Sequence, residues 1–192
     1  MNNMDQTGTI NSQDRTEKVI TQTVNWIRKV VIQCNFCPFA AREINRNTVH
    51  YQVEMATDWE ACLLAFKQEC LRLDEDASIA TTLLILPDAF PDFMDFLDLV
   101  TKAEKMLRLE DYEGIYQVAS FHPLYQFAGA PSDDASNYTN RSVYPMLHLL
   151  REEAVEEALE HYPDPEGIPD RNIDFAREKG AAYMKMLRDS CL

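Results

Sequence analysis

The sequence predicts a single α/β domain with a small, mostly parallel sheet of three or more strands, packed with five or six helices. Apolar residues recur at the helical spacing in several segments, and short segments rich in β-branched and apolar residues lie between them. Because helices and strands alternate, we expect parallel strands joined by right-handed crossovers. An α+β sandwich, in which an edge strand runs antiparallel, is the alternative.

The N-terminal half provides most of these elements. Residues 1–13 are polar and aperiodic, which predicts a flexible tail before the domain at 14–192. Asp14 and Glu17 resemble a capping box at the start of a helix that runs to Cys34. The elements predicted next are a strand at 48–55, a helix at 57–73 capped by Thr57, a buried strand at 79–86, a helix at 92–107 begun by Asp92 and a strand at 115–121.

The C-terminal part begins with a segment that has no periodicity, residues 122–142. A connection of this length within a compact domain is usually functional or disordered, and its aromatic residues argue against disorder. Pro145 is suited to the first turn of a helix, which we expect to continue to His161. A last helix is predicted from Pro169 to Arg188.

The composition argues against several classes of partner. The chain has 18 Lys and Arg against 32 Asp and Glu, a formal charge of −14, which disfavours nucleic acids and anionic membrane surfaces. Its apolar runs are shorter than the roughly 18 residues of a membrane helix. The first residues have neither the basic start nor the apolar stretch of a signal peptide, and the cysteines are odd in number. We therefore expect a cytoplasmic protein with reduced thiols.

Polar and aromatic side chains are concentrated in the 122–142 segment, directly after a predicted strand. Ligands of open α/β sheets bind beyond the carboxyl ends of the strands, so these residues are candidates for a site. Each of them also has an ordinary structural role open to it, such as closing an Asx turn or pairing with a carboxylate. The candidates are His122, Tyr125, Asp134, Asn140 and Arg141.

Three more candidates follow in the helix predicted from Pro145. His148, Arg151 and Glu152 would project from one side of that helix, because they are three and four residues apart. A His and a Glu at this spacing can share a metal ion, or the carboxylate can orient the imidazole for proton transfer. A solvated cluster with no chemical role is an equally good interpretation.

Cys37 is the candidate nucleophile. Pro38 suits the first turn of a short helix ending near Ile44, which would place Cys37 at the N-cap. Backbone N–H groups and the positive end of the helix dipole would then lower the pKa of the thiol below about 8.5. If the first helix instead continued past Cys37, the thiol would be inert.

Several long motifs together resemble an uncharacterised bacterial family, domain of unknown function 1415, from about Val19 to the last helix. They are Cys37–Ala40, Thr81–Leu84, Gln117–Pro123, Tyr125–Phe127, Asn137–Ser142, Tyr144–Glu152 and Arg171–Ile173. The resemblance implies no activity. The family pattern has a cysteine at Cys37 and usually an apolar residue at Cys34, which makes the Cys-x-x-Cys spacing accidental. The motif residues it implies are Cys37, His122, Asp134, Asn140, Arg141, His148, Arg151 and Glu152.

The leading hypothesis is a small enzyme, a hydrolase or transferase that acts on a small anionic molecule in one polar pocket. Its catalytic residues would be Cys37, His122, His148 and Glu152, and its substrate-binding residues Asn140, Arg141, Arg151 and Tyr125. A second hypothesis is a site for one divalent transition metal, held by His122, His148 and either Cys37 or a carboxylate of Asp134 or Glu152. A third is a non-catalytic binding or assembly protein whose acidic helix meets a basic partner.

Overall fold

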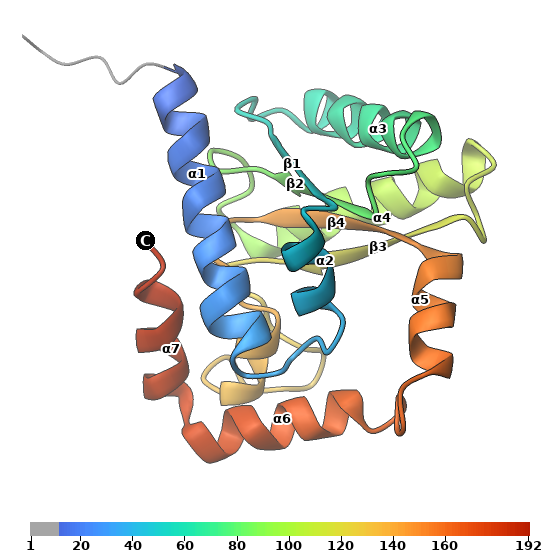
Figure 1. Cartoon of the computed structure of the whole chain (residues 1–192). Helices are drawn as coiled ribbons and strands as arrows, with labels where there is room; N and C mark the ends of the chain where they lie inside the picture. The colour runs from blue at the N-terminus through green and yellow to red at the C-terminus, as the bar shows by residue number, and fades with distance from the viewer. Residues whose placement is uncertain (1–11) are drawn as a thin grey trace, which may run out of the picture.

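The computed structural model describes residues 12–192 and contains one mixed sheet in a mixed α/β domain (Figure 1). The strands are β1 (Val49–Val53), β2 (Thr81–Ile85), β3 (Tyr116–Phe121) and β4 (Met146–Arg151), in the spatial order β1-β2-β4-β3. β1 and β2 are parallel, whereas β4 runs antiparallel to both β2 and β3. The α/β class is confirmed, and the expectation of a mostly parallel sheet is wrong.

Seven α-helices surround the sheet in the described part of the chain. Asp92 caps its helix as predicted, because its Oδ1 accepts from the backbone N–H of Met94 at 2.7 Å. The cap of the preceding helix is Asp58, one residue after the predicted Thr57. The helices are α1 (Ser12–Trp26), α2 (Ala40–Arg46), α3 (Trp59–Glu75), α4 (Phe93–Leu109), α5 (Glu152–Glu160), α6 (Ile168–Lys179) and α7 (Ala181–Asp189), with a π-helix η1 (Ile27–Ile32) and a 3-10 helix η2 (Ala135–Thr139).

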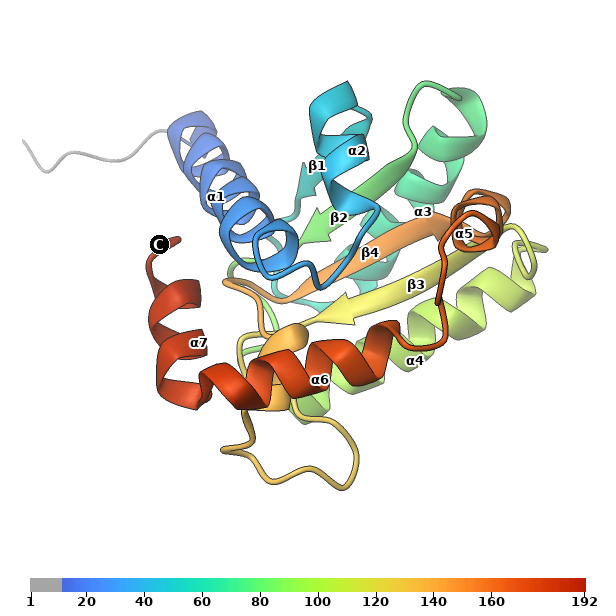
Figure 2. The ribbon, with the colours of Figure 1, turned by 60° about the horizontal axis from the view of Figure 1, so that its bottom comes forward.

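Helices cover both faces of the sheet (Figures 1 and 2). Leu84 and Leu86 pack with α3 and α4 on one face, and Leu83 and Ile85 pack with α1 and η1 on the other. Residues of α2, α6 and α7 join this second cluster. β2 is therefore buried on both faces, as predicted for the apolar run at 79–86.

The largest correction concerns the helix predicted from Pro145 to His161. Its first half is the strand β4, which lies between β2 and β3, and only residues from Glu152 onward are helical. The run Met146–Leu150 is rich in good helix formers, but a short apolar run cannot be assigned by periodicity alone. Here Leu147 and Leu149 are completely buried against α3 and α4, and two strands satisfy the backbone hydrogen bonds.

Two further predictions differ in detail from the structure. The last predicted helix is split into α6 and α7 at Gly180, whose φ of 81° lies in the region that favours glycine. The predicted tail at 1–13 lies outside the described residues except for Ser12 and Gln13, which begin α1. Among residues 12–192, no helix is long and apolar enough to cross a membrane.

Candidate functional site

His122 is a buried structural residue at the end of β3. Its Nε2–H donates to the carbonyl of Phe90 at 2.9 Å, and its Nδ1 accepts from the backbone N–H of Leu124 at 3.0 Å. The ring stacks on Phe96, and burial lowers the pKa of His122, which keeps the ring neutral. Because both ring nitrogens are engaged, neither is available here for proton transfer or for a metal ion.

The other polar candidates of the 122–142 segment hold that segment together. The Arg141 guanidinium donates to the carbonyls of Tyr125 at 2.9 Å and Ser132 at 2.8 Å. Asn140 donates from Nδ2 to the carbonyl of Ser120 at 3.3 Å. The Tyr125 ring packs against Phe93. Their side chains thus satisfy loop carbonyls and apolar contacts, which is the ordinary role considered for them above.

Asp134 also has a structural role. Its carboxylate caps η2 by accepting from the backbone N–H of Ser136 at 2.9 Å, and it pairs with Arg177 of α6 at 2.8 Å. The hydrogen bond from Arg177 holds the pKa of Asp134 well below its usual range. This acid therefore fastens the loop to α6.

Arg151 lies at the end of β4 and caps the C-terminus of α3. Its Nη2 donates to the carbonyls of Leu73 at 2.6 Å and Ile79 at 3.1 Å, and its Nη1 donates to the Tyr116 hydroxyl at 3.3 Å. The carbonyls at a helix end have no partner within the helix, so a guanidinium here stabilises α3.

His148 lies on β4, on the face of the sheet that α1 and η1 cover. Its Nε2 is 2.7 Å from the hydroxyl oxygen of Thr81, and that hydroxyl itself donates to the carbonyl of Leu149. Nε2 therefore carries the proton, and Nδ1 has no hydrogen-bond partner in residues 12–192. Burial lowers the pKa of His148 to about 4, which makes it a weak base near neutral pH.

Glu152 does not lie on the same helix face as His148. The predicted helical spacing between them is wrong, because His148 is in a strand and Glu152 opens α5. Glu152 instead lines a cavity of about 210 Å³ at the outer edge of the sheet, beside Tyr116 and Gln117. Arg151 points to the other face of β4 from His148, so the three candidates do not form one cluster.

Cys37 lies in the turn between η1 and α2, three residues before Ala40, the first residue of α2. The predicted N-cap position is wrong, because Phe39 is the N-cap of this helix. Backbone N–H groups of Phe39 and Ala40 do lower the pKa of the thiol, as expected from that position. Burial has the larger effect and raises the pKa of Cys37 above its ordinary value. The predicted activation is therefore wrong in sign, and the neutral thiol is the favoured form.

The predicted site residues consequently do not share one pocket. The side chains of His122, Arg141 and Arg151 hydrogen-bond mainly to backbone groups, and Glu152 lies at the edge of the sheet. Within the described chain, no three His, Cys, Asp or Glu side chains are grouped so as to hold a metal ion.

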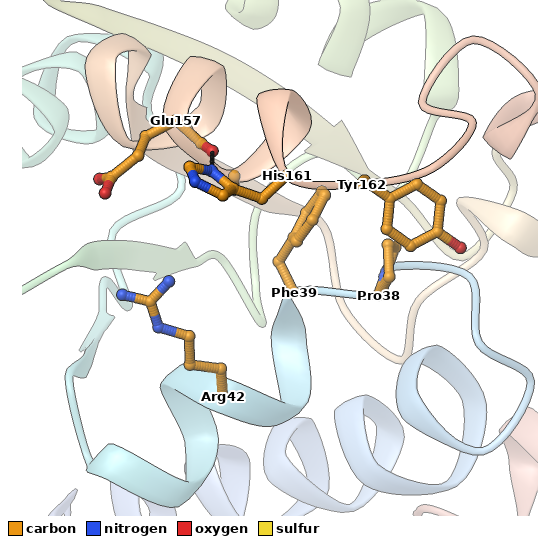
Figure 3. A pocket seen from close by; sticks show the side chains of 7 residues that line it. Pro38, Phe39, Arg42, Glu157, His161 and Tyr162 are labelled. Carbon is orange, nitrogen blue, oxygen red and sulfur yellow. Dashed lines mark hydrogen bonds between the residues drawn. The ribbon is translucent and has the colours of Figure 1, made fainter.

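The best candidate site is a cavity of about 380 Å³ between the start of α2 and the end of α5, the α2–α5 cavity (Figure 3). Figure 3 shows the Arg42 side chain rising from α2 toward α5, where Glu157 and His161 lie. Phe39 and Tyr162 stand next to each other, with ring centroids 5.8 Å apart. The lining residues are Pro38, Phe39, Arg42, Glu157, Ala158, His161 and Tyr162.

The start of α6 fixes one wall of this cavity. Arg171 donates to the Tyr162 hydroxyl and to the carbonyl of Asn35, both at 2.7 Å, and Asn172 donates to the carbonyl of Phe36 at 2.7 Å. These bonds hold the turn that leads into α2 against the segment that follows α5. The aromatic pair thus has a rigid support although its members lie far apart in the sequence.

The polar groups of the α2–α5 cavity suit proton transfer and anion binding. His161 donates from Nδ1 to the carbonyl of Glu157 at 2.8 Å, which leaves Nε2 as the acceptor of the neutral ring. Arg42 approaches Glu43 with Nε at 3.3 Å, and its terminal nitrogens have no hydrogen-bond partner in the part of the chain described. A guanidinium in this state can bind a carboxylate or phosphate with two parallel hydrogen bonds.

The sequence patterns did not indicate Phe39, Arg42, His161 or Tyr162 as site residues. Phe39 belongs to the motif at Cys37–Ala40, but Cys37 is the residue of that motif with an obvious chemical function. His161 was placed only as the end of a helix. A local signal was present, since a His and a Tyr adjoin the Pro- and Gly-containing turn at 163–167. Nothing in the sequence links that turn to α2.

Comparisons with known proteins agree with the motifs described above. The sequence matches the family described as "Protein of unknown function (DUF1415)" over residues 18–186. No curated protein and no solved structure matches the chain. The matched segment includes β4, the turn before α2 and both walls of the α2–α5 cavity. The chain therefore belongs to this family of unknown function.

Proposed function

We propose that the protein is a small-molecule enzyme, a hydrolase or transferase, that acts on an anionic substrate in the α2–α5 cavity. The observation that carries this proposal is the state of His161. Its Nδ1 is bound to the carbonyl of Glu157, so its other nitrogen is left for a substrate in a cavity that also contains Arg42.

Arg42 would bind the anionic group of the substrate. The whole chain has a formal charge of −14, so an anion needs a local cation to approach and remain bound. The guanidinium geometry matches carboxylates and phosphates. The cavity volume of about 380 Å³ falls in the range of small-molecule sites.

His161 would act as the general base and then as the general acid. Nε2 would take a proton from the attacking water or hydroxyl group, and the resulting imidazolium would return it to the leaving group. The carbonyl of Glu157 accepts a hydrogen bond from Nδ1 in both protonation states, which keeps the ring in one orientation. Phe39 and Tyr162 would hold a flat or apolar part of the substrate.

The test uses two chromogenic probes, p-nitrophenyl phosphate and mono-p-nitrophenyl succinate, each with a flat ring and an anionic group. For the probe that is turned over, His161→Gln should lower kcat by roughly 10²–10⁴-fold with little change in KM. Arg42→Gln should raise KM by about tenfold, since it removes the anion contact. Arg46→Gln, an exposed arginine at the other end of α2, is the matched charge control.

Three outcomes distinguish the candidate functions. Unchanged turnover in His161→Gln would disprove the role of this histidine. Binding without turnover in the wild type would assign the cavity to a non-catalytic binding protein. Turnover that a chelator abolishes would favour the metal-dependent alternative, for which His122 would have to give up its present hydrogen bonds.

A further inference from the structure

We infer that the ligand of the α2–α5 cavity is zwitterionic, an α-amino acid with an aromatic or apolar side chain. This inference rests on the proposed function, since it names the substrate class of the same site. It starts from two opposite charges, Arg42 and Glu157, that line one cavity without pairing with each other.

The two charged groups come from different walls. Arg42 projects from α2, and its closest acidic partner is Glu43, one residue along the same helix. Glu157 projects from α5, and its carboxylate takes part in no hydrogen bond or ion pair within residues 12–192. No Arg42 nitrogen lies within the 4.0 Å ion-pair distance of a Glu157 oxygen. Each group is therefore available to a ligand.

Glu157 is the reason to expect a positive charge on the ligand beside its anionic group. An anion bound to Arg42 would share the cavity with the negative carboxylate of Glu157, and this repulsion would oppose part of the attraction. A ligand with an ammonium group beside its carboxylate would be attracted by both walls. Specificity often arises in this way, because only a ligand that carries both charges can pair with both groups of the protein.

The remaining lining residues indicate the side chain. Pro38, Phe39, Ala158 and Tyr162 form the apolar part of the cavity, and the rings of Phe39 and Tyr162 meet edge to face. Aromatic side chains bind a third ring in offset or edge-to-face contact. His161 lies on the same helix as Glu157, one turn further on, so its Nε2 would lie near the polar end of the amino acid.

The experiment measures binding to the full chain by isothermal titration calorimetry with three probes. L-phenylalanine carries both charges, 3-phenylpropionate lacks the ammonium group and L-phenylalaninamide lacks the carboxylate. We expect L-phenylalanine to bind at least tenfold more tightly than either analogue. Glu157→Gln should remove this advantage over 3-phenylpropionate, whereas Arg42→Gln should weaken both acids. Glu156→Gln, an exposed acid beside Glu157 that does not line the cavity, is the control.

The results separate this inference from the proposed function. Equal affinity for L-phenylalanine and 3-phenylpropionate, or an unchanged preference in Glu157→Gln, would overturn the zwitterion and leave an anion site at Arg42. No binding of L-phenylalanine at millimolar concentration would also overturn it. The proposed function fails on a different observation, namely unchanged turnover of the anionic esters in His161→Gln.

Discussion

Two neighbouring threonines of β2 differ in their hydrogen bonding because they face opposite sides of the sheet. The hydroxyl of Thr81 accepts from His148 and donates to the carbonyl of Leu149. Thr82 is completely buried, and its Oγ1 has no hydrogen-bond partner among residues 12–192. A buried hydroxyl without a partner costs roughly 1–3 kcal/mol, whereas a hydrogen bond that is made contributes about 1 kcal/mol.

Valine at these two positions should therefore have opposite effects. Thr82→Val, which keeps the shape and removes the unpaired oxygen, should raise the free energy of unfolding by about 1 kcal/mol. Thr81→Val should lower it by about 1–2 kcal/mol, because it leaves the Nε2–H of His148 and the carbonyl of Leu149 without that partner. Urea denaturation of the two variants measures both changes. Equal losses would show that the Thr82 hydroxyl has a role like that of Thr81.

The candidate residues show why single positions in the sequence were hard to interpret. His, Asp and Arg in one long loop predicted a site, but a loop that packs against the core needs the same residue types for its own backbone. Arg141 donates to two loop carbonyls and Asp134 caps η2. The same residue types are therefore typical of a loop stabilised by its own hydrogen bonds and of a functional site, and the sequence does not distinguish the two.

Arg151 connects two elements, β4 and α3. Its guanidinium donates to the carbonyls of Leu73, Asp76 and Ile79, so the end of α3 and the turn after it depend on a residue 72 to 78 positions away. Such charge-assisted hydrogen bonds are stronger than neutral ones, and the carbonyl of Leu73, in the last turn of α3, has no partner within the helix.

Arg151→Met should lower the free energy of unfolding by about 2–4 kcal/mol, because several charge-assisted bonds are lost and only the aliphatic packing is kept. Arg108→Met, which changes an exposed arginine of α4, should cost less than about 0.5 kcal/mol. Amide exchange should also become faster at 73–79 than in α4. Equal effects of the two variants would argue against a capping role for Arg151.

Elements were predicted well where the pattern is local. The helices at 57–73 and 92–107 and the strands at 48–55, 79–86 and 115–121 all have counterparts. The helices repeat an amphipathic period, and the strand at 79–86 is a short apolar run that is buried on both faces. β4 was missed because the run Met146–Leu150 consists mostly of apolar residues that also favour helices and is too short to show a period. Its neighbours β2 and β3 decide the conformation.

For the whole molecule, His148 makes folding depend on pH. Burial lowers the pKa of His148 in the folded protein to about 4, whereas a histidine in the unfolded chain has a pKa near 6.5. Between these values the unfolded chain binds more protons, so stability increases with pH and falls as the pH decreases from about 6.5 toward 4. His50 and His122 also have lowered pKa values and act in the same direction.

The free energy of unfolding should therefore fall between about pH 7 and pH 4.5, and His148 should account for about 2.5 kcal/mol of the decrease. His148→Gln should be less stable than the wild type at pH 7 but less sensitive to pH over this interval. The difference between the two urea-denaturation curves isolates His148, because His50 and His122 remain in both proteins. Parallel curves would show that His148 is protonated with an ordinary pKa in the folded chain.

By itself, the sequence determined the α/β class of the fold, most of the helices and three of the four strands found in residues 12–192. It also indicated that the 122–142 segment is ordered. These properties follow from composition and from periodicities of two or 3.6 residues, which report the side of an element that is buried. The family motifs likewise come directly from the order of residues.

Only the tertiary structure decided that β4 runs antiparallel to its neighbours, that both ring nitrogens of His122 form hydrogen bonds, and that the α2–α5 cavity exists. Each depends on which segments become neighbours after the chain has folded. Periodicity identifies a buried face without identifying what covers it, and a polar residue type is the same whether its partner is a carbonyl or a ligand. Arg42 and His161 line one cavity because α6 holds the turn before α2 against the segment after α5. No local pattern encodes this contact between distant segments.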